Sequence, residues 1–200
     1  MDELGRPEAS FPDTAGEGMT KLRRWFVRLL MVLAIGLPLA AIAIYVINPL
    51  GANSYDPRQR MVGHSPYRVA GNDMAPTLHP GQIVVMRVAY AADERPKRGD
   101  IVIFINDDDG NNWIKRVVGL PGERIAIADG VVRIDGRDLV EDYVAPENVS
   151  TDYSREMATT EIPQSAYFLL GDNRDNSMDA RMLGVTRHDQ LVGKVATILK

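Results

Sequence analysis

The sequence contains no cysteine. This absence excludes disulfides, thiolate metal ligands and cysteine nucleophiles, but it is compatible with either side of a membrane. Positive charge is not in excess either, because 23 lysines and arginines stand against 27 aspartates and glutamates. With a sequence pI near 5.4 and no basic face, the chain lacks the electrostatic signature of a nucleic-acid-binding protein. We therefore expect no nucleic acid among its partners.

Large apolar side chains are scarce at the start of the chain, where glycine, proline and acidic residues are interspersed in "MDELGRPEASFPDTAGEGMT". Such a segment cannot bury enough apolar surface to offset the entropy cost of ordering its backbone. We therefore expect residues 1–20 to form a disordered tail with no function of its own.

A transmembrane anchor is predicted for residues 21–50. The run from Leu29 to Ile47 contains no charged residue, and at ~1.5 Å per residue it matches the hydrocarbon core of a bilayer. Pro38 would break a soluble helix but is tolerated in a membrane helix. Two alternatives fit less well. A cleaved signal peptide has a shorter apolar region followed by small residues, and a buried soluble helix would show a polar stripe.

The charges around this run predict its orientation. Basic residues precede the run, at Lys21, Arg23, Arg24 and Arg28, whereas "NPLGANSYD" follows it. The positive-inside rule places the amino terminus, and thus the tail, in the cytoplasm and residues 51–200 on the extracytoplasmic side. The expected location is the cytoplasmic (inner) membrane, crossed once, with membrane lipid as a partner.

Residues 51–200 are predicted to form a mainly β domain, because short apolar runs are separated by turn residues. The expected strands lie in "QIVVMRVAY", "DIVIFIN", "WIKRVVGL", "RIAIADGVVRIDGRDLV", "AYFLLGDN" and "QLVGKVATIL". Asp129-Gly130 and Asp135-Gly136 are strong signals for tight hairpin turns. No stretch of this part shows a convincing helical period. The polar segment 144–162 is expected to be a long surface loop.

A dense polar loop, "GDNRDNSMDAR", follows the apolar run "YFLL". In one interpretation its charged residues pair with one another and hold a buried turn; these are Asp172, Arg174, Asp175 and Arg181. In the other, the loop supports a nearby functional site. The two interpretations are compatible.

Lys115 is a second candidate for a functional residue. It precedes Arg116 on an expected strand, so the two side chains face opposite sides and one cation is directed toward the packed face. A single lysine on a strand is usually exposed to solvent, and spacing alone does not decide which cation is buried.

The acidic run Asp107-Asp108-Asp109-Gly110 raises the question of a metal site. The glutamate that closes an EF-hand loop is absent there and in "GDNRDNSMD", so a solvated hairpin tip is the better interpretation of the acidic run. The histidines are single and separated, at His64, His79 and His188. We therefore predict no metal and no cofactor.

Four motifs in order resemble the type I signal peptidases, membrane serine proteases that remove signal peptides from exported proteins. The motifs are "DMAPTLHPG", "RGDIVIF", "KRVVGLPGE" and "GDNRDNSMDAR", and the resemblance extends from about Leu22 to Gly193. It implies a signal-peptidase-like antiparallel β-sheet domain on a single N-terminal transmembrane helix. The implied partners are signal peptides or other extended peptides of exported proteins.

The resemblance also implies roles for individual residues. Lys115 falls on the general base of a Ser/Lys dyad, and Ser177 falls on the hydroxyl that orients this base. Asp179 and Arg181 fall on a structural ion pair beneath the site. The remaining implied residues border the substrate groove (Met74, Pro76, Ile83 and Val84) or support the site (Asp172 and Arg174).

Asp73 falls on the nucleophile, which is normally serine. A carboxylate is a poor nucleophile toward an amide, and the dyad needs a neutral lysine. An opposite charge ~4 Å away stabilises the ammonium by roughly 4 kcal/mol at an effective dielectric constant near 20. We therefore predict an Asp73–Lys115 ion pair and negligible Ser/Lys activity. Gly71 is a smaller departure, because some members of the family have a side-chain donor to the oxyanion hole there.

Three hypotheses about function follow. The first is an active peptidase that uses a water activated by Asp73, or another nucleophile such as Ser65 or Thr77. The second is a catalytically inactive homologue that binds extended peptides as a chaperone or assembly factor. The third is an altered form of an ordinary peptidase whose serine form is active.

Overall fold

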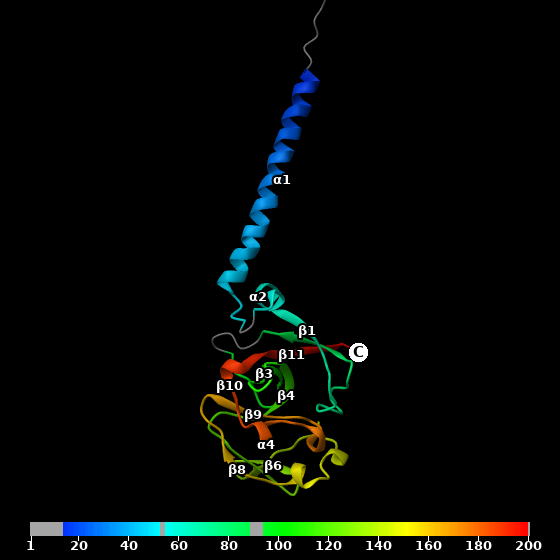
Figure 1. Cartoon of the computed structure of the whole chain (residues 1–200), viewed down its shortest axis with the longest axis vertical. Coiled ribbons are helices and arrows are strands. Elements are labelled where there is room, and N and C mark those ends of the chain that lie inside the picture. The colour runs from blue at the N-terminus through cyan, green and yellow to red at the C-terminus, as the bar shows by residue number, and fades with distance from the viewer. Residues whose placement is uncertain (1–13, 53–54, 89–93, 200) are drawn as a thin grey trace, which may run out of the picture. The chain divides into compact units, whose positions relative to one another are not determined.

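The computed structural model describes residues 14–52, 55–88 and 94–199. Residues 1–13 of the expected tail lie outside this part of the chain. The chain divides after Val46 into two compact units. The first contains nearly all of helix α1, and the second contains every other helix and strand labelled in Figure 1.

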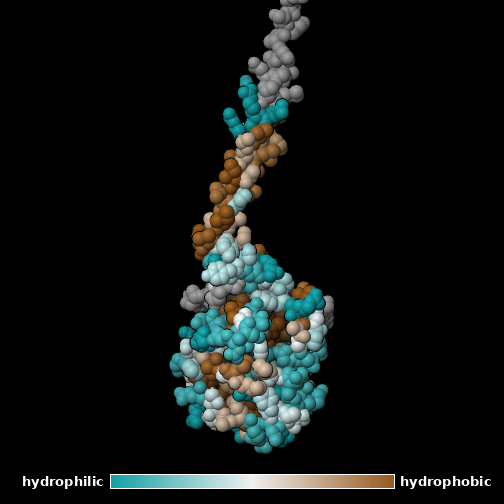
Figure 2. All heavy atoms as spheres, in the orientation of Figure 1, coloured by the Kyte–Doolittle hydropathy of each residue, from teal (hydrophilic) through white to brown (hydrophobic). Residues whose placement is uncertain are grey.

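Helix α1 spans Thr14–Ile47, and so begins earlier than residue 21, where we expected the anchor to start. Its segment Lys21–Ile47 is long and apolar enough to cross a membrane, and its 27 residues extend about 40 Å at the helical rise per residue. Pro38 lies inside the helix without ending it. Figure 2 shows hydrophobic side chains along this segment and hydrophilic ones at its basic end. These properties are consistent with a single-pass membrane anchor.

The second unit is built on two antiparallel sheets. Within the described residues, the larger sheet has seven strands in the order β1-β2-β11-β3-β4-β9-β10, and the smaller has four in the order β7-β6-β5-β8. The strands are β1 (His64–Arg68), β2 (Ile83–Arg87), β3 (Ile101–Ile105), β4 (Asn112–Gly119), β5 (Arg124–Ala128), β6 (Val131–Ile134), β7 (Arg137–Asp138), β8 (Met157–Glu161), β9 (Ala166–Leu170), β10 (Thr186–Arg187) and β11 (Leu191–Leu199). The predicted mainly β, antiparallel fold class is therefore confirmed.

The expected hairpin turns are present in the smaller sheet. Asp129-Gly130 joins β5 to β6, and Asp135-Gly136 joins β6 to β7. All four of these residues have positive φ, between 50° and 81°. A two-residue hairpin turn of this kind needs positive φ at both positions, and Asp-Gly adopts it with little strain. These local signals were sufficient to predict the turns.

Short elements differ from the sequence-based expectation. Strand β8 lies inside segment 144–162, where we expected only a loop, and pairs with β5. Its residues are almost all exposed, so it lacks the apolar alternation by which a half-buried strand is predicted. The short helices are α2 (Pro57–Val62), α3 (Asp152–Arg155) and α4 (Ala180–Leu183), with 3-10 turns at η1 (Pro146–Asn148), η2 (Arg174–Asn176) and η3 (His188–Gln190). None is long enough to show a helical period.

Three clusters of apolar side chains form the core of the second unit, and one of them positions the candidate site. This cluster packs the loop after β1 against β2, β3 and β11, through Val69, Met74, Leu78, Val84, Met86, Ile103 and Val192. Met74 and Leu78 are fully buried, and burying such a side chain contributes ~1.5–3 kcal/mol. The backbone on either side of Met74, including Asp73, is thereby held against the sheet.

Candidate active site

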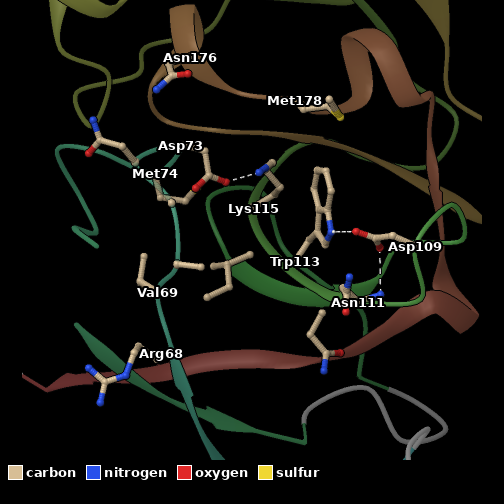
Figure 3. Close-up of a pocket in the computed structure, with 15 residues that line it drawn as sticks. Arg68, Val69, Asp73, Met74, Asp109, Asn111, Trp113, Lys115, Asn176 and Met178 are labelled. Carbon is tan, nitrogen blue, oxygen red and sulfur yellow. Dashed lines mark hydrogen bonds and ion pairs between the residues drawn. The ribbon is translucent and has the colours of Figure 1, made fainter. Parts of the chain in front are cut away.

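Asp73 and Lys115 form an ion pair at the edge of a cavity (Figure 3). The ammonium Nζ of Lys115 donates a hydrogen bond to Oδ2 of Asp73. The Lys115 side chain is only 2% exposed, whereas that of Asp73 is 28% exposed. The expected pair is therefore present.

The loop that contains Asp73 is also held from the side of the dense polar loop. The backbone N–H of Asn173 donates to the carbonyl oxygen of Asp73 at 3.0 Å. The side-chain amide of Asn173 donates to the carbonyl oxygen of Asn72 at 3.2 Å. The backbone at Asp73 is therefore held in two ways: by the buried side chain of Met74 and by hydrogen bonds from the polar loop.

Lys115 and Arg116 are both buried, with 2% and 8% of their surfaces exposed. Alternation along a strand predicts that one of two neighbouring side chains faces solvent, and this expectation is wrong here. The reason is that both faces of β4 are covered from Lys115 onward, since its last five residues are all buried. The Lys115 ammonium lies 5.1 Å from the centre of the Trp113 ring, and the Arg116 guanidinium lies 3.9 Å from that of Tyr143.

Arg116 connects β4 to the polar loop through Asp172. Its Nε and Nη2 donate to the two oxygens of Asp172 at 2.8 and 2.6 Å. Thr77 also donates to Asp172, with 2.5 Å between Oγ1 and Oδ2. Three parts of the chain therefore meet at one fully buried carboxylate, which fixes the loop after Asp73 relative to the strand of Lys115.

Asp172, Arg174, Asp175 and Arg181 of the polar loop do not pair with one another as one interpretation predicted. Their partners are Arg116 for Asp172, Glu141 for Arg174, Ser150 and Thr151 for Asp175, and Asp179 for Arg181. The loop is buried, but it is held mainly by residues from other segments. Sequence neighbours could not reveal these partners, because Glu141 and Ser150 belong to segments without a regular pattern.

The ion pair expected between Asp179 and Arg181 is present. Arg181 donates to both carboxylate oxygens of Asp179 at 2.8 Å, and its guanidinium lies 4.0 Å from the centre of the Tyr153 ring. Asp179 also accepts a hydrogen bond from the backbone N–H of Gly171 at 3.0 Å. This pair therefore braces both ends of the polar loop.

Ser177 does not make the hydrogen bond to Lys115 that the resemblance implied. Its Oγ is buried and has no hydrogen-bond partner within the part of the chain that the structure describes. Ser177 nevertheless lies close to the site, because a Cβ added to Gly171 would overlap its Oγ and lie 2.5 Å from the carbonyl oxygen of Asp73. The Lys115 ammonium is directed to Asp73 instead, and Ser177 is left beside the pair.

Neither alternative nucleophile named from the sequence lies in the cavity. Ser65 is 1% exposed, and its Oγ donates to Oδ2 of Asp56 at 3.3 Å. Thr77 donates its hydroxyl hydrogen to Asp172. Neither residue is among those that line the cavity.

The cavity has a volume of about 720 Å³ and runs between the segment before Asp73 and strand β4. Figure 3 shows the Asp73–Lys115 pair with Asn176 and Met178 on one side, and Arg68 at the far end. The lining residues are Arg68, Val69, Ala70, Gly71, Asn72, Asp73, Met74, Asp109, Asn111, Asn112, Trp113, Ile114, Lys115, Asn176 and Met178.

This lining only partly matches the expected groove. Met74 lines the cavity, but Pro76, Ile83 and Val84 do not. Val84 is fully buried in the core, because alternate residues of β2 face the apolar cluster. Trp113 and Met178 also line the cavity. They were not predicted as site residues, because their nearness to the site depends on how β4 and the polar loop meet.

One edge of β4 is open along the cavity. Residues Asn112–Lys115 pair with β3 on one side, whereas pairing with β9 on the other side starts only at Arg116. No described strand pairs with the second edge of this half of β4. Its backbone groups are therefore positioned to accept an added strand.

Two groups near the site have strongly shifted pKa values. Burial alone would raise the pKa of Asp175, but hydrogen bonds from Ser154, Ser150 and Thr151 outweigh it and hold the pKa well below its ordinary value. Burial raises the pKa of Tyr143 far above its ordinary value, and the nearby charge of Glu141 raises it further.

Within the described ranges, no three histidine, aspartate or glutamate side chains gather as a metal site.

The β domain therefore has a buried lysine paired with a loop carboxylate at a cavity that runs along an open strand edge. The chain belongs to the signal peptidase family, because the family model described as signal peptidase, peptidase S26, matches residues 22–200.

Two relatives named signal peptidase I agree with this assignment. The chain is 34% identical over 134 residues to signal peptidase I T of Bacillus subtilis strain 168. The aligned region covers 64% of this chain and 69% of the relative. The chain is 35% identical over 147 residues to a signal peptidase I of Bacillus caldolyticus, covering 68% and 79% of the two chains. The crystal structure of a signal peptidase I from Enterococcus faecalis V583 is 34% identical, with a TM-score of 0.47, and covers 52% of this chain and 98% of that chain.

Proposed function

We propose that this chain is a single-pass membrane protein that recognises signal peptides, or similar extended peptides of exported proteins, without cleaving them by a Ser/Lys dyad. The observation on which this proposal rests is the ion pair between Asp73 and the buried Lys115. The membrane anchor is α1, the amino terminus is cytoplasmic, and the β domain is extracytoplasmic, as the positive-inside rule predicts.

Loss of dyad chemistry follows from the two groups in the pair. A dyad needs a hydroxyl nucleophile and a neutral amine that takes its proton. The carboxylate of Asp73 is a poor nucleophile toward an amide, and it engages Lys115 in an ion pair where the dyad has a hydroxyl. Ser65 and Thr77 are engaged elsewhere, so neither replaces the missing hydroxyl.

Peptide recognition is supported by the open edge of β4. An extended peptide that added to Asn112–Lys115 would gain main-chain hydrogen bonds, while the cavity would receive some of its side chains. Neither contact requires the hydroxyl that is missing at position 73. Binding can therefore persist where cleavage is lost, and the relatives named signal peptidase I support signal peptides as the bound class.

The test compares cleavage of a labelled preprotein in liposomes by three forms of the full chain. These are the unmodified chain, Asp73→Ser, and Asp73→Ser combined with Lys115→Ala. Binding of a labelled signal peptide to the unmodified chain is measured in parallel. We expect binding without cleavage by the unmodified chain, and cleavage by Asp73→Ser alone.

Cleavage by the unmodified chain at a rate comparable to Asp73→Ser would overturn the loss of dyad chemistry and require another attacking group. Absence of signal-peptide binding would overturn the recognition role. Cleavage by the double variant would show that Lys115 is not the base.

A further inference from the structure

The three aspartates of the acidic hairpin tip between β3 and β4 make different contacts. Asp107 pairs with Arg187 at 3.1 Å, and the Asp108 carboxylate makes no hydrogen bond within the described residues. Asp109 differs from both, because it lines the cavity and accepts a hydrogen bond from the indole N–H of Trp113 at 3.1 Å. The run that the sequence analysis interpreted as a solvated tip therefore contains one residue tied to the candidate site.

Both oxygens of Asp109 act as acceptors. Oδ2 accepts from Trp113 Nε1, and Oδ1 accepts from the backbone N–H of Asn111 at 2.9 Å. The second bond fixes the carboxylate relative to the hairpin backbone, and the first fixes the indole relative to the carboxylate (Figure 3).

Trp113 is held at two further places. It is the cross-strand neighbour of Phe104, with the ring centres 6.5 Å apart and the rings tilted by 56°. Its other contact is with the Lys115 ammonium, 5.1 Å from the ring centre. The indole therefore stands at the wall of the cavity, directly beside the Asp73–Lys115 pair, in a single orientation.

We propose that Asp109 is a positioning residue that acts through Trp113 to fix one wall of the peptide cavity and so sets the size of side chain accepted beside Lys115. This proposal rests on the peptide-recognition function proposed above. The indole bounds the space beside Lys115 on one side. When the hydrogen bond to Asp109 is absent, the indole can rotate about its side-chain torsions and widen the cavity.

The chemistry of the two bonds predicts how substitutions at Asp109 differ. Alanine removes both acceptors. Asparagine keeps one acceptor oxygen but places an amide donor where the second is needed, so one of the two bonds is lost. Alanine is therefore expected to have the larger effect and asparagine an intermediate one. Asp108→Ala is the matched control, because it removes an equal charge from the same exposed tip without touching Trp113.

The test uses the full chain in detergent and two fluorescein-labelled peptides taken from the end of a signal peptide. The peptides differ only in having alanine or phenylalanine at the side chain that enters the cavity. The measured quantity is the ratio of the two dissociation constants. We expect Asp109→Ala to shift this ratio about tenfold in favour of phenylalanine, the scale on which an apolar pocket discriminates size, and Asp108→Ala to leave it unchanged.

A second readout follows Trp113 directly. The chain has 2 tryptophans, so Trp25→Phe leaves Trp113 as the single emitter. Asp109→Ala should lower the fluorescence anisotropy of Trp113 and shift its emission, whereas Asp108→Ala should change neither. Unchanged emission, or an unchanged preference in a variant that binds peptide, overturns the proposal. If no form binds peptide, the recognition function itself fails, and the emission still decides whether Asp109 positions Trp113.

Discussion

Arg116 lies against Asp172 in a bidentate ion pair, with both carboxylate oxygens within 2.8 Å of guanidinium nitrogens. Asp172 is fully buried, and Thr77 donates to it as well. The Asp172 carboxylate therefore joins three segments: the strand that contains Lys115, the loop that follows Asp73, and the polar loop. This relationship explains how residues far apart in sequence form one rigid site.

The first prediction concerns this pair. Asp172→Ala leaves the Arg116 guanidinium buried without its partner, and breaking a buried pair costs ~3–5 kcal/mol. Asp138→Ala is the control, because Arg133 and Asp138 are 41% and 66% exposed and such surface pairs contribute ~0–1 kcal/mol. Urea unfolding of the full chain in detergent, followed by circular dichroism, measures both. Equal decreases in the free energy of unfolding for the two variants would contradict the proposed role of Asp172.

The second prediction concerns Asp73 and Lys115. Asp73→Ala leaves a buried ammonium without an opposite charge, whereas Lys115→Met leaves a carboxylate that is partly exposed to water. The first change should therefore destabilise the second unit more than the second change. A double-mutant cycle should give a coupling free energy on the order of 1–3 kcal/mol. A coupling near zero would show that the pair does not form in solution.

The third prediction concerns pH. Because hydrogen bonds lower the pKa of Asp175 in the folded state, its contribution to stability is present above the ordinary pKa of 3.8 and is lost as pH falls through the folded value. Asp175→Ala should therefore destabilise the chain most at neutral pH. The difference in free energy of unfolding between the variant and the unmodified chain should shrink as the solution is acidified. Free energies of unfolding at several pH values measure this. A destabilisation that grew on acidification would contradict the prediction.

The fourth prediction concerns Gly171. A Cβ there would lie 2.5 Å from the carbonyl oxygen of Asp73 and 2.6 Å from Cβ of Ser177, so alanine must displace one of these segments. In the Asp73→Ser background, such a displacement should reduce preprotein cleavage about 10²-fold. Gly36→Ala, where a Cβ meets nothing within 4 Å, is the control. Full activity of the Gly171→Ala form would show that the two loops tolerate separation.

Several parts of the molecule could be predicted because their signals are local. The Asp-Gly turns and the apolar strands are determined by neighbouring residues, and α1 is determined by one uninterrupted apolar run. Strand β8 could not be predicted, because its polar residues form a strand only by pairing with β5.

The site was predictable only in part. The resemblance brought Asp73 and Lys115 together, and the structure places them in contact. Partners such as Glu141 for Arg174 and Asp109 for Trp113 depend on how separate segments pack, which no pattern along the chain records. The burial of Arg116 was missed for the same reason, because it requires both faces of β4 to be covered.

The order of strands has a consequence for synthesis of the protein. Strands β2 and β3 are not paired with each other, and β11, near the end of the chain, lies between them. The β1–β2 hairpin therefore has no neighbour on its β2 side in the larger sheet until the chain has been made beyond Leu191. Contacts between residues so distant in sequence slow folding. Until β11 has been synthesised, β2 and β3 must also avoid pairing with each other or with other strands.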